Sequence, residues 1–247
     1  MKQVADNAWV GTGTVVNWLV VREGDALTLV DSGWPGDIGA LEASLACIGQ
    51  HPRDIKAVLL THAHVDHMGG LNVLWRRYRV PVFMHPAELP MARGERREQA
   101  TPMDILASSW RPRVAVWGTR ILLAGGLRHP TIEHANAWDS NGPLDLPGSP
   151  VPVPCVGHTS GHTAYLFPDQ GVIATGDALV TEHPASGRKT PHLLPSVYHK
   201  DIEEARRSLQ ELAVVDADTV VPGHGYVWSG SLKSAVRAAG DRHDVGT

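Results

Sequence analysis

Residues 61–70 read Thr61-His62-Ala63-His64-Val65-Asp66-His67-Met68-Gly69-Gly70. They follow the short apolar run 57–60, which predicts a buried strand. Three imidazoles and a carboxylate stand within six positions, 62–67, where a tight turn can aim them into one cavity. His62 and His64 share a face of an extended segment, and Asp66 and His67 point to a neighbouring position. The spacing predicts two adjacent metal ions, and nitrogen and oxygen ligands without cysteine suit zinc, iron or manganese.

Three later segments carry the same residue types, and each follows a predicted strand. They are Gly157-His158-Thr159-Ser160-Gly161-His162-Thr163, Thr175-Gly176-Asp177 and Pro222-Gly223-His224-Gly225. Loops that follow strands are where α/β folds place ligands and chemistry. Each segment alone is a weak signal, but together and in this order they indicate one shared site.

The ordered set THAHVDH, GHTSGHT, TGD and PGHG resembles the metallo-β-lactamase superfamily. Residues 27–33, LTLVDSG, also resemble the strand of that family that ends in Asp-Ser/Thr-Gly. The similarity runs from about residue 15 to residue 224. It implies an α/β fold, namely a four-layer αββα sandwich with an insertion between its two halves. It also implies two divalent metal ions, in the first place Zn²⁺, with iron or manganese as alternatives.

The resemblance assigns a role to each candidate residue. The first metal would be held by His62, His64 and His158, the second by Asp66, His67 and His224, and Asp177 would bridge both. His162, the second histidine of GHTSGHT, is expected to support the site rather than to be a ligand. Asp31 is expected to be a structural residue beneath the site.

The expected activity follows from this chemistry. A water between two dications loses a proton near neutral pH and becomes a nucleophile, while one metal polarises the scissile carbonyl. Asp66, expected to be catalytic as well as a ligand, holds the nucleophile in line and can shuttle its proton. We therefore expect a metal-dependent hydrolase that cleaves an ester, thioester or lactone with a metal-bridging hydroxide. Tyr226, two residues beyond His224, is expected either to contact the substrate or to pack in the core.

Departures from the family's patterns narrow the substrate. Zinc β-lactamases of the family normally lack the bridging aspartate, so Asp177 argues against β-lactam hydrolysis as the main activity, and a weak β-lactamase remains an alternative. Acyl-homoserine lactonases of the family carry a tyrosine shortly after this aspartate, and it is missing from the run Asp177-Ala178-Leu179-Val180. We find neither the glutathione-binding helical region of glyoxalase II enzymes nor the tRNA-gripping arm of the family's nucleases. A general esterase, thioesterase or lactonase fits best.

Two hypotheses from other classes stay open. Persulfide dioxygenases share the fold and use a single iron, and TGDAL resembles their segment after the aspartate, although their glycine-cysteine-glycine-arginine run is absent here. A non-catalytic metal-binding scaffold is the other hypothesis, and the complete ligand set argues against it. Metal content distinguishes a single-iron dioxygenase from a hydrolase. Turnover that is lost in Asp66→Ala distinguishes a hydrolase from a non-catalytic scaffold.

The remaining sequence predicts alternating strands and helices in one domain, residues 1–247. Strands are expected at 15–21, 27–30, 57–60, 80–84, 151–156, 163–167, 171–175 and 219–221, and helices at 38–48, 69–78, 201–212 and 231–239.

Residues 86–150 are expected to form a helical insertion that caps the site. Its tryptophans, Trp110, Trp117 and Trp138, could line a substrate pocket, with Trp117 the candidate for contact, or could fill the insertion's own small core. Arg93, Arg96 and Arg97 could meet an anionic acyl carrier or form a solvated face.

Composition excludes several classes of protein. Hydrophobic residues make up 43% of the chain and charged residues 19%, which is typical of a globular protein. The net charge of -4 does not suggest a nucleic-acid partner, and a small-molecule substrate is expected. Cys155, one of two cysteines, is expected to be a small buried residue. We find neither a signal peptide nor a run of roughly 18 apolar residues, so we expect a cytoplasmic protein without membrane contact. The oligomeric state stays open.

Overall fold

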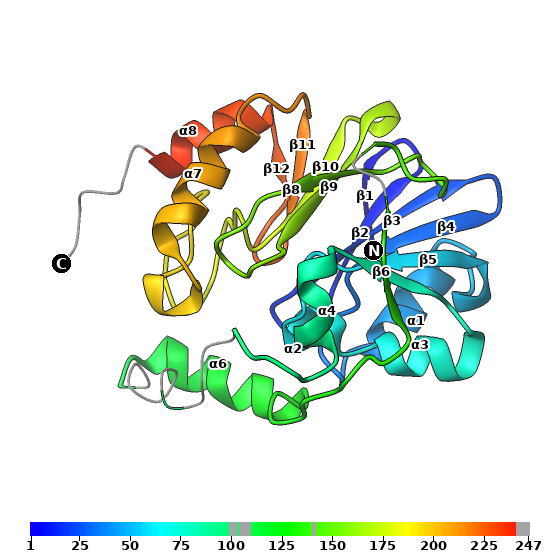
Figure 1. Cartoon of the computed structure of the whole chain (residues 1–247), viewed down its shortest axis with the longest axis horizontal. Helices are drawn as coiled ribbons and strands as arrows, with labels where there is room; N and C mark the ends of the chain where they lie inside the picture. The colour runs from blue at the N-terminus through cyan, green and yellow to red at the C-terminus, as the bar shows by residue number, and fades with distance from the viewer. Residues whose placement is uncertain (99–102, 104–109, 140–141, 241–247) are drawn as a thin grey trace.

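The computed structural model describes residues 1–98, 103, 110–139 and 142–240, and in it two β-sheets face each other (Figure 1). The first half of the chain forms a seven-stranded sheet whose strands lie in sequence order. Its strands are β1 (Lys2–Ala5), β2 (Ala8–Thr12), β3 (Asn17–Glu23), β4 (Ala26–Val30), β5 (Ile55–Leu59), β6 (Val82–Met84) and β7 (Ala135–Ala137). Strands β1 to β4 pair antiparallel, and β4 to β7 pair parallel.

The second half of the chain forms a five-stranded sheet in the order β12-β11-β10-β9-β8. Its strands are β8 (Val151–Pro154), β9 (Thr163–Phe167), β10 (Val172–Gly176), β11 (Thr219–Pro222) and β12 (Trp228–Ser229). Strands β10 and β11 are parallel, so their carboxyl ends lie at the same edge of the sheet. The other pairs are antiparallel. The strands predicted in this half are confirmed within a few residues, and β12 was not predicted.

Strand β3 shows why the two sheets stack. Its residues alternate between faces, and both faces are apolar, as expected for a sheet that is covered on both sides. Trp18 and Val20 pack toward the helices on one face, whereas Leu19 and Val21 pack against the second sheet. Residues of β9, β10 and β11 complete that inner layer. The two sheets therefore share a core built from both halves of the chain.

Helices cover the outer face of each sheet. On the first sheet they are α1 (Ile38–Cys47) and α3 (Leu71–Tyr78), and on the second α7 (Ile202–Leu212) and α8 (Leu232–Gly240). Helix α7 begins after Asp201, whose side chain accepts a hydrogen bond from the backbone N–H of Glu204. Figure 1 shows α7 and α8 on the side of the molecule opposite to α1 and α3. The predicted four-layer αββα sandwich is confirmed.

Residues 86–150 differ in part from the predicted helical insertion. They contain the helices α4 (Leu89–Ala92) and α6 (Pro112–Leu123), but also β7, which pairs with β6 at the edge of the first sheet. Trp138, directly after β7, is buried, and its indole Nε1 donates a hydrogen bond to the hydroxyl of Tyr165 in β9 over 3.1 Å. Trp138 is therefore hydrogen-bonded to strand β9 of the second sheet, which neither of the two predictions for this side chain anticipated. Trp110 is 75% exposed and fills no core.

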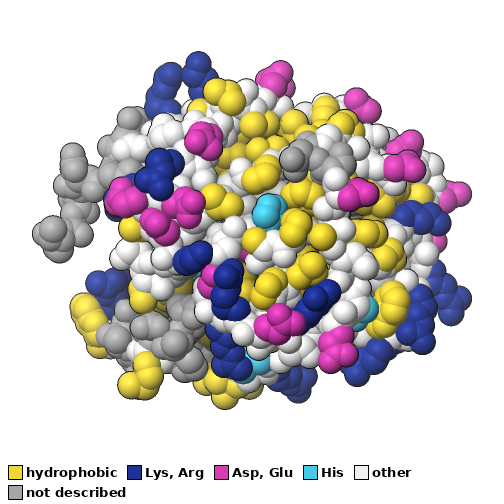
Figure 2. All heavy atoms as spheres, in the orientation of Figure 1, with side chains coloured by type: hydrophobic (Ala, Val, Ile, Leu, Met, Phe, Trp, Pro, Cys, Tyr) yellow, Lys and Arg dark blue, Asp and Glu magenta, His cyan; other side chains and the backbone are white. Residues whose placement is uncertain are grey.

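The burial of the polar residues points to the site. Of the 14 histidines, eight are buried in the described part of the chain, and little histidine is visible on the face of the molecule in Figure 2. Buried histidines need polar partners, so this number of buried histidines indicates a polar site inside the protein. Within the described ranges, no helix is both long and apolar enough to cross a membrane.

Candidate metal centre

Seven side chains from four loops meet where the strand ends of the two sheets converge. His62 and His64 follow β5, and Asp66 and His67 lie on the short helix α2 (Val65–Met68). His158 lies between β8 and β9, Asp177 follows β10, and His224 follows β11. Every predicted ligand is brought into this cluster. Three overlapping groups have candidate ligand atoms within 4.8 Å of one another: His62–His64–His158, His62–His67–Asp177 and Asp66–His67–His224.

The first group consists of three buried imidazoles. The Nε2 atom of His158 lies 3.1 Å from Nδ1 of His64. The rings of His62 and His158 are perpendicular, with their centroids 4.7 Å apart. These three side chains were predicted to hold the first metal, and their nitrogens face one another.

The residues predicted for the second metal, Asp66, His67 and His224, which we call the second group, add a carboxylate. The Nε2 atom of His224 lies 3.3 Å from the Oδ2 atoms of both Asp66 and Asp177. The Nε2 atom of His67 lies 3.8 Å from Oδ2 of Asp66 and 3.5 Å from Oδ1 of Asp177. Asp177 also reaches the first group, because its Oδ2 lies 3.7 Å from Nε2 of His158. Asp177 therefore stands between the two groups, where a bridging ligand would stand.

Four of the histidines are held from behind by oxygen atoms. His64 Nε2 donates to the carbonyl oxygen of Glu98 over 3.1 Å, His67 Nδ1 to Asp31 Oδ2 over 2.7 Å, and His224 Nδ1 to the carbonyl oxygen of Val15. His62 Nδ1 lies 3.0 Å from the hydroxyl oxygen of Thr61, which itself donates to Asp31 and so accepts from His62. Each of these bonds fixes which ring nitrogen carries the proton. The opposite nitrogen is left facing the cluster, the arrangement that metal-ligating histidines show.

The atoms that face the cluster fit a metal ion. Among the described residues, eight buried side-chain nitrogen or oxygen atoms lack a hydrogen-bond partner, and four belong to this cluster. Three of them, His62 Nε2, His67 Nε2 and Asp177 Oδ1, lie among the candidate ligand atoms, and the fourth is His158 Nδ1, the ring nitrogen other than the Nε2 that faces His64 and Asp177. Buried polar groups without a partner are costly, and cation coordination supplies such a partner. Imidazole nitrogen and carboxylate oxygen are ligands that zinc, iron and manganese accept.

The two groups differ in their electrostatics. Burial and the neighbouring imidazoles hold the pKa of His62 and His158 well below the usual value, so the first group offers neutral ligands. Burial alone would lower the pKa of His224, but Asp177 and Asp66 outweigh it and raise that pKa to about 10. Burial opposes the ionisation of Asp66, yet the nearby His67 and His224 lower its pKa to about 2. The negative potential that favours a proton on His224 also favours a divalent cation there.

His162 lies behind Asp177 and not among the facing atoms. Its Nε2 accepts a hydrogen bond from the backbone N–H of Asp177 over 3.0 Å, and its Nδ1 lies 3.2 Å from Sγ of Cys155. Both ring nitrogens are thus engaged, and neither is left for a metal. Cys155 is buried, as expected, and burial raises the pKa of its thiol to about 12.

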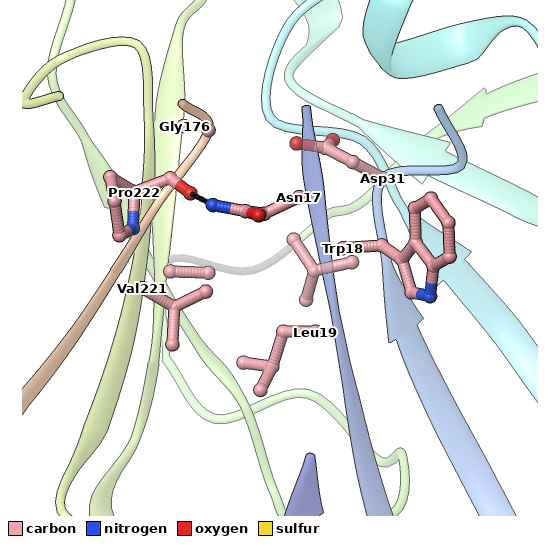
Figure 3. Close-up of a pocket in the computed structure, with 10 residues that line it drawn as sticks. Asn17, Trp18, Leu19, Asp31, Gly176, Val221 and Pro222 are labelled. Carbon is pink, nitrogen blue, oxygen red and sulfur yellow. Dashed lines mark hydrogen bonds between the residues drawn. The ribbon is translucent and has the colours of Figure 1, made fainter. Parts of the chain in front are cut away.

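Several supporting residues were not predicted. The side-chain amide of Asn17, at the start of β3, donates to the carbonyl oxygens of Pro222 and Gly225 over 2.9 and 2.8 Å, and so holds the loop of His224. Figure 3 shows Asn17 reaching across the small cavity beneath the site toward Pro222, with Asp31 nearby. Val15 has a φ of 62°, which is rare for a β-branched residue and is typical of strain near functional sites. No sequence signal marks Val15, and Asn17 offers only a polar residue at the start of an apolar strand.

The residues predicted to contact substrate lie at the border of the cluster. Trp117 of α6 is buried among Val16, Trp34 and Val65, and its ring lies 4.9 Å from that of His183, edge to face. The ring of His183 in turn lies 4.8 Å from that of His224. Helix α6 is therefore anchored next to the ligand loops. Tyr226 is 42% exposed, and its hydroxyl donates to the carbonyl oxygen of Lys189.

The three arginines of the predicted cluster are exposed. Arg96 lies 2.6 Å from a carboxylate oxygen of Glu98, whose backbone carbonyl accepts from His64. One of the three therefore takes part in an ion pair at the edge of the site.

Comparison with known proteins gives consistent results. A family model described as the metallo-beta-lactamase superfamily matches residues 11–224. The probable metallo-hydrolase YflN of Bacillus subtilis is 24% identical over 220 residues, which cover 84% of this chain and 78% of YflN. The hydroxyacylglutathione hydrolase of Halorhodospira halophila is 31% identical over 193 residues, which cover 78% of this chain but 54% of that enzyme. The crystal structure of TTHA1623 in a di-iron-bound form superposes with a TM-score of 0.62 at 25% identity, and covers 94% of this chain and 98% of its own.

Proposed function

The chain belongs to the metallo-β-lactamase superfamily, and from this premise we propose that it is a two-metal hydrolase of a small ester, thioester or lactone. The relatives that it matches include a probable metallo-hydrolase and a hydroxyacylglutathione hydrolase, which supports hydrolysis. The bond that is cleaved, the number of metals and their identity belong to the proposal.

One observation carries the proposal. Four imidazoles have their outer nitrogen tied to an oxygen atom, so that their other nitrogen points toward the same small volume as the buried carboxylate of Asp177 and the partly exposed carboxylate of Asp66. A histidine-rich surface loop would not need such bonds. A single-metal site would not need both complete groups, and a two-metal site uses all seven side chains.

The first metal would be held by His62, His64 and His158, the second by Asp66, His67 and His224, and Asp177 would touch both. When bound, such a pair of cations supplies a water that is deprotonated near neutral pH and a polarised carbonyl group. We propose Zn²⁺ as the native metal on the basis of this donor set. The di-iron form of TTHA1623 makes iron the alternative to test.

Asp66 is placed to handle the proton. Its side chain is 14% exposed, whereas that of Asp177 is 4% exposed. A carboxylate that touches both the cluster and solvent can accept a proton at Oδ2 from the attacking water and release it outward. Asp177 is buried against the imidazoles of His67, His158 and His224, so it can hold position but has no such route. We assign Asp66 as the catalytic carboxylate.

Substrate contact is assigned to the border of the site. Tyr226 is exposed and lies two residues beyond His224. Trp117 contacts the ring of His183, which in turn contacts the ring of His224. Aromatic side chains at this border suit an acyl group of moderate size. The hydroxyacylglutathione hydrolase among the relatives supports an acyl substrate, although only about half of that enzyme is matched.

A panel of hydrolysis assays tests the proposal. Protein loaded with Zn²⁺, Fe²⁺ or Mn²⁺ is assayed on an aryl ester, a glutathione thioester, an acyl-coenzyme A, several lactones, a chromogenic cephalosporin and a single-stranded oligonucleotide. Asp66→Ala is run beside each assay. Asp169→Ala is the matched control, because Asp169 is exposed on the turn Pro168–Gln170, at the opposite end of β10.

We expect turnover of at least one acyl substrate that Asp66→Ala lowers by at least about a hundredfold and that Asp169→Ala leaves unchanged. Turnover that survives in Asp66→Ala would contradict the proposed mechanism. A protein that binds a single iron and hydrolyses nothing in the panel would favour the dioxygenase hypothesis.

A further inference from the structure

A buried glutamate lies directly behind the first group of histidines. Glu88 ends the short 3₁₀ turn Pro86–Glu88, which follows strand β6. Its side chain is completely shielded from solvent. A fully buried carboxylate is rare unless it is paired or fully hydrogen-bonded.

The carboxylate of Glu88 accepts three short hydrogen bonds. Oε2 accepts from the backbone N–H of Ala63 over 2.7 Å. Oε1 accepts from the hydroxyl of Thr159 and from the backbone N–H of Gly161, each over 2.7 Å. Two of the three donors are backbone groups, which cannot change their role from donor to acceptor.

The three donors belong to the two loops that carry the first group of candidate ligands. Ala63 lies between His62 and His64, and Thr159 follows His158. The loops are distant in sequence, since His64 and His158 are 94 positions apart. A single side chain therefore connects the loop of the first two histidines to the loop of the third.

The second loop is pressed tightly against this turn. A Cβ atom at Gly161 would lie 2.8 Å from Nδ1 of His85 and 3.1 Å from Cγ of Glu88, so the close approach requires glycine. His85 begins the turn, and its Nδ1 accepts from the backbone N–H of Ala87. The position of Glu88 is thus fixed by its own turn and by the loop that packs on it.

We propose that Glu88 is a positioning residue that, as a carboxylate, holds the two ligand loops at the spacing the first metal requires. It acts through Ala63, Thr159 and Gly161 and touches neither metal nor substrate. The inference rests on the metal site of the proposed function but does not depend on which bond the enzyme cleaves.

Glutamine cannot replace Glu88 in this role. If the amide nitrogen takes the place of Oε2, it faces the N–H of Ala63. If it takes the place of Oε1, it faces the N–H of Gly161. Either orientation sets a donor against a donor and leaves one buried backbone N–H without a partner. One of the two loops must then shift, and the three histidines lose their common spacing.

The test measures metal binding and not turnover. Metal-free wild-type protein and Glu88→Gln are titrated with Co²⁺, with a chromophoric chelator as competitor, and the visible absorption of the bound ion is recorded. Glu42→Gln is the matched control, because Glu42 also accepts two hydrogen bonds, from Arg77 and Tyr78, but on the outer face of the first sheet. Thr159→Val removes one donor and spares both backbone bonds, so it is a milder variant should Glu88→Gln fail to fold.

We expect wild type and Glu42→Gln to bind two Co²⁺ ions with the same affinities. Glu88→Gln should lose about 10- to 100-fold in affinity at one of the two sites, and Thr159→Val should lose less at that same site. Hydrogen exchange in the metal-free proteins should show faster exchange at Ala63 and Gly161 in Glu88→Gln.

Unchanged affinities at both sites, or an equal fall at both, would overturn the inference, because the second outcome describes a general loss of structure. The same criterion applies to Thr159→Val if Glu88→Gln does not fold. Failure of the proposed function gives a different result, namely wild-type protein that binds no Co²⁺, or that binds two ions and hydrolyses nothing.

Discussion

The Nδ1 atom of His67 donates a hydrogen bond to the Oδ2 atom of Asp31 over 2.7 Å, although 36 positions of sequence separate the two residues. The same carboxylate accepts from the backbone N–H and the hydroxyl of Thr61. Asp31 thereby orients His67 of the second group directly and His62 of the first group through Thr61. Its own backbone has a φ of 61°, a left-handed conformation that aspartate and asparagine tolerate better than most residues. One carboxylate behind the site thus sets the direction of two candidate ligands.

Replacing Asp31 by Asn should weaken metal binding while the fold is kept. Asparagine has nearly the same shape and also accepts a left-handed backbone, but its amide cannot accept hydrogen bonds from both His67 and Thr61. We expect metal affinity to fall by about 10- to 100-fold, as is usual when the outer partner of a ligating histidine is lost. Chelator competition measures the affinity, and circular dichroism checks the fold. Wild-type affinity in a folded variant would show that Asp31 only supports the strand end.

The two histidines of GHTSGHT should respond differently to substitution by alanine. His158→Ala removes a facing nitrogen and should abolish one metal site, with loss of most activity. His162→Ala removes the acceptor for the N–H of Asp177 and should keep two metals with a smaller fall in activity. Metal content by mass spectrometry and kcat/KM on one substrate compare the two variants. A greater metal loss in His162→Ala would reverse our assignment of the ligand.

Trp117→Ala should lower stability and also raise KM. The indole is buried against Val65 and next to His183, so its truncation should cost about 3–5 kcal/mol in the free energy of unfolding. Trp110→Ala is the control, because Trp110 is 75% exposed on the same segment and should change stability by less than about 0.5 kcal/mol. Denaturant unfolding and steady-state kinetics separate the two effects. An unchanged KM in Trp117→Ala would assign the side chain to packing alone.

Removal of the metals should lower the melting temperature. A ligand at 100 times its Kd adds about 2.7 kcal/mol to the stability of the folded state, and each kcal/mol corresponds to about 2–4 °C for a domain of this size. We expect chelation to lower the Tm by roughly 5–10 °C for each metal held at that excess, and re-addition of Zn²⁺ to restore it. Asp66→Ala, which lacks one ligand of the second group, should show a smaller drop. A Tm that does not respond to chelation would mean that the folded protein holds no metal.

The sequence predicts the candidate ligands well because they lie in short motifs at fixed spacing, each directly after an apolar run. The strands can also be recognised locally, because β3 and β10 are apolar on both faces. The turns next to the strands contain glycine or charged residues. Asp201 and the spacing of Ala205, Leu209 and Leu212 similarly predict helix α7. Each of these features lies within one short segment, so it can be recognised in a single sequence.

The residues that support the ligands could not be predicted in this way. Glu88 meets Thr159 only after the two sheets have stacked, and its segment, HPAEL, looks like any turn after a strand. Val15 acts through a backbone carbonyl, so its side chain gives no hint of the contact with His224. Strand β7 has three residues, Ala135 to Ala137, too few to show alternation, so the sequence did not predict the bond between Trp138 and Tyr165. Contacts between segments far apart in the chain leave no trace in either segment alone.

Four of the seven candidate ligands come from residues 62–67 and three from residues 158–224, so each sheet contributes part of the centre and neither holds all of it. This division constrains how the gene can change. A recombination that exchanged one half for the corresponding half of a distant relative would preserve each sheet and its helices, yet the donors would meet at altered distances. The distances between the candidate ligands therefore depend on how the surfaces of the two sheets fit together, and not on either half alone.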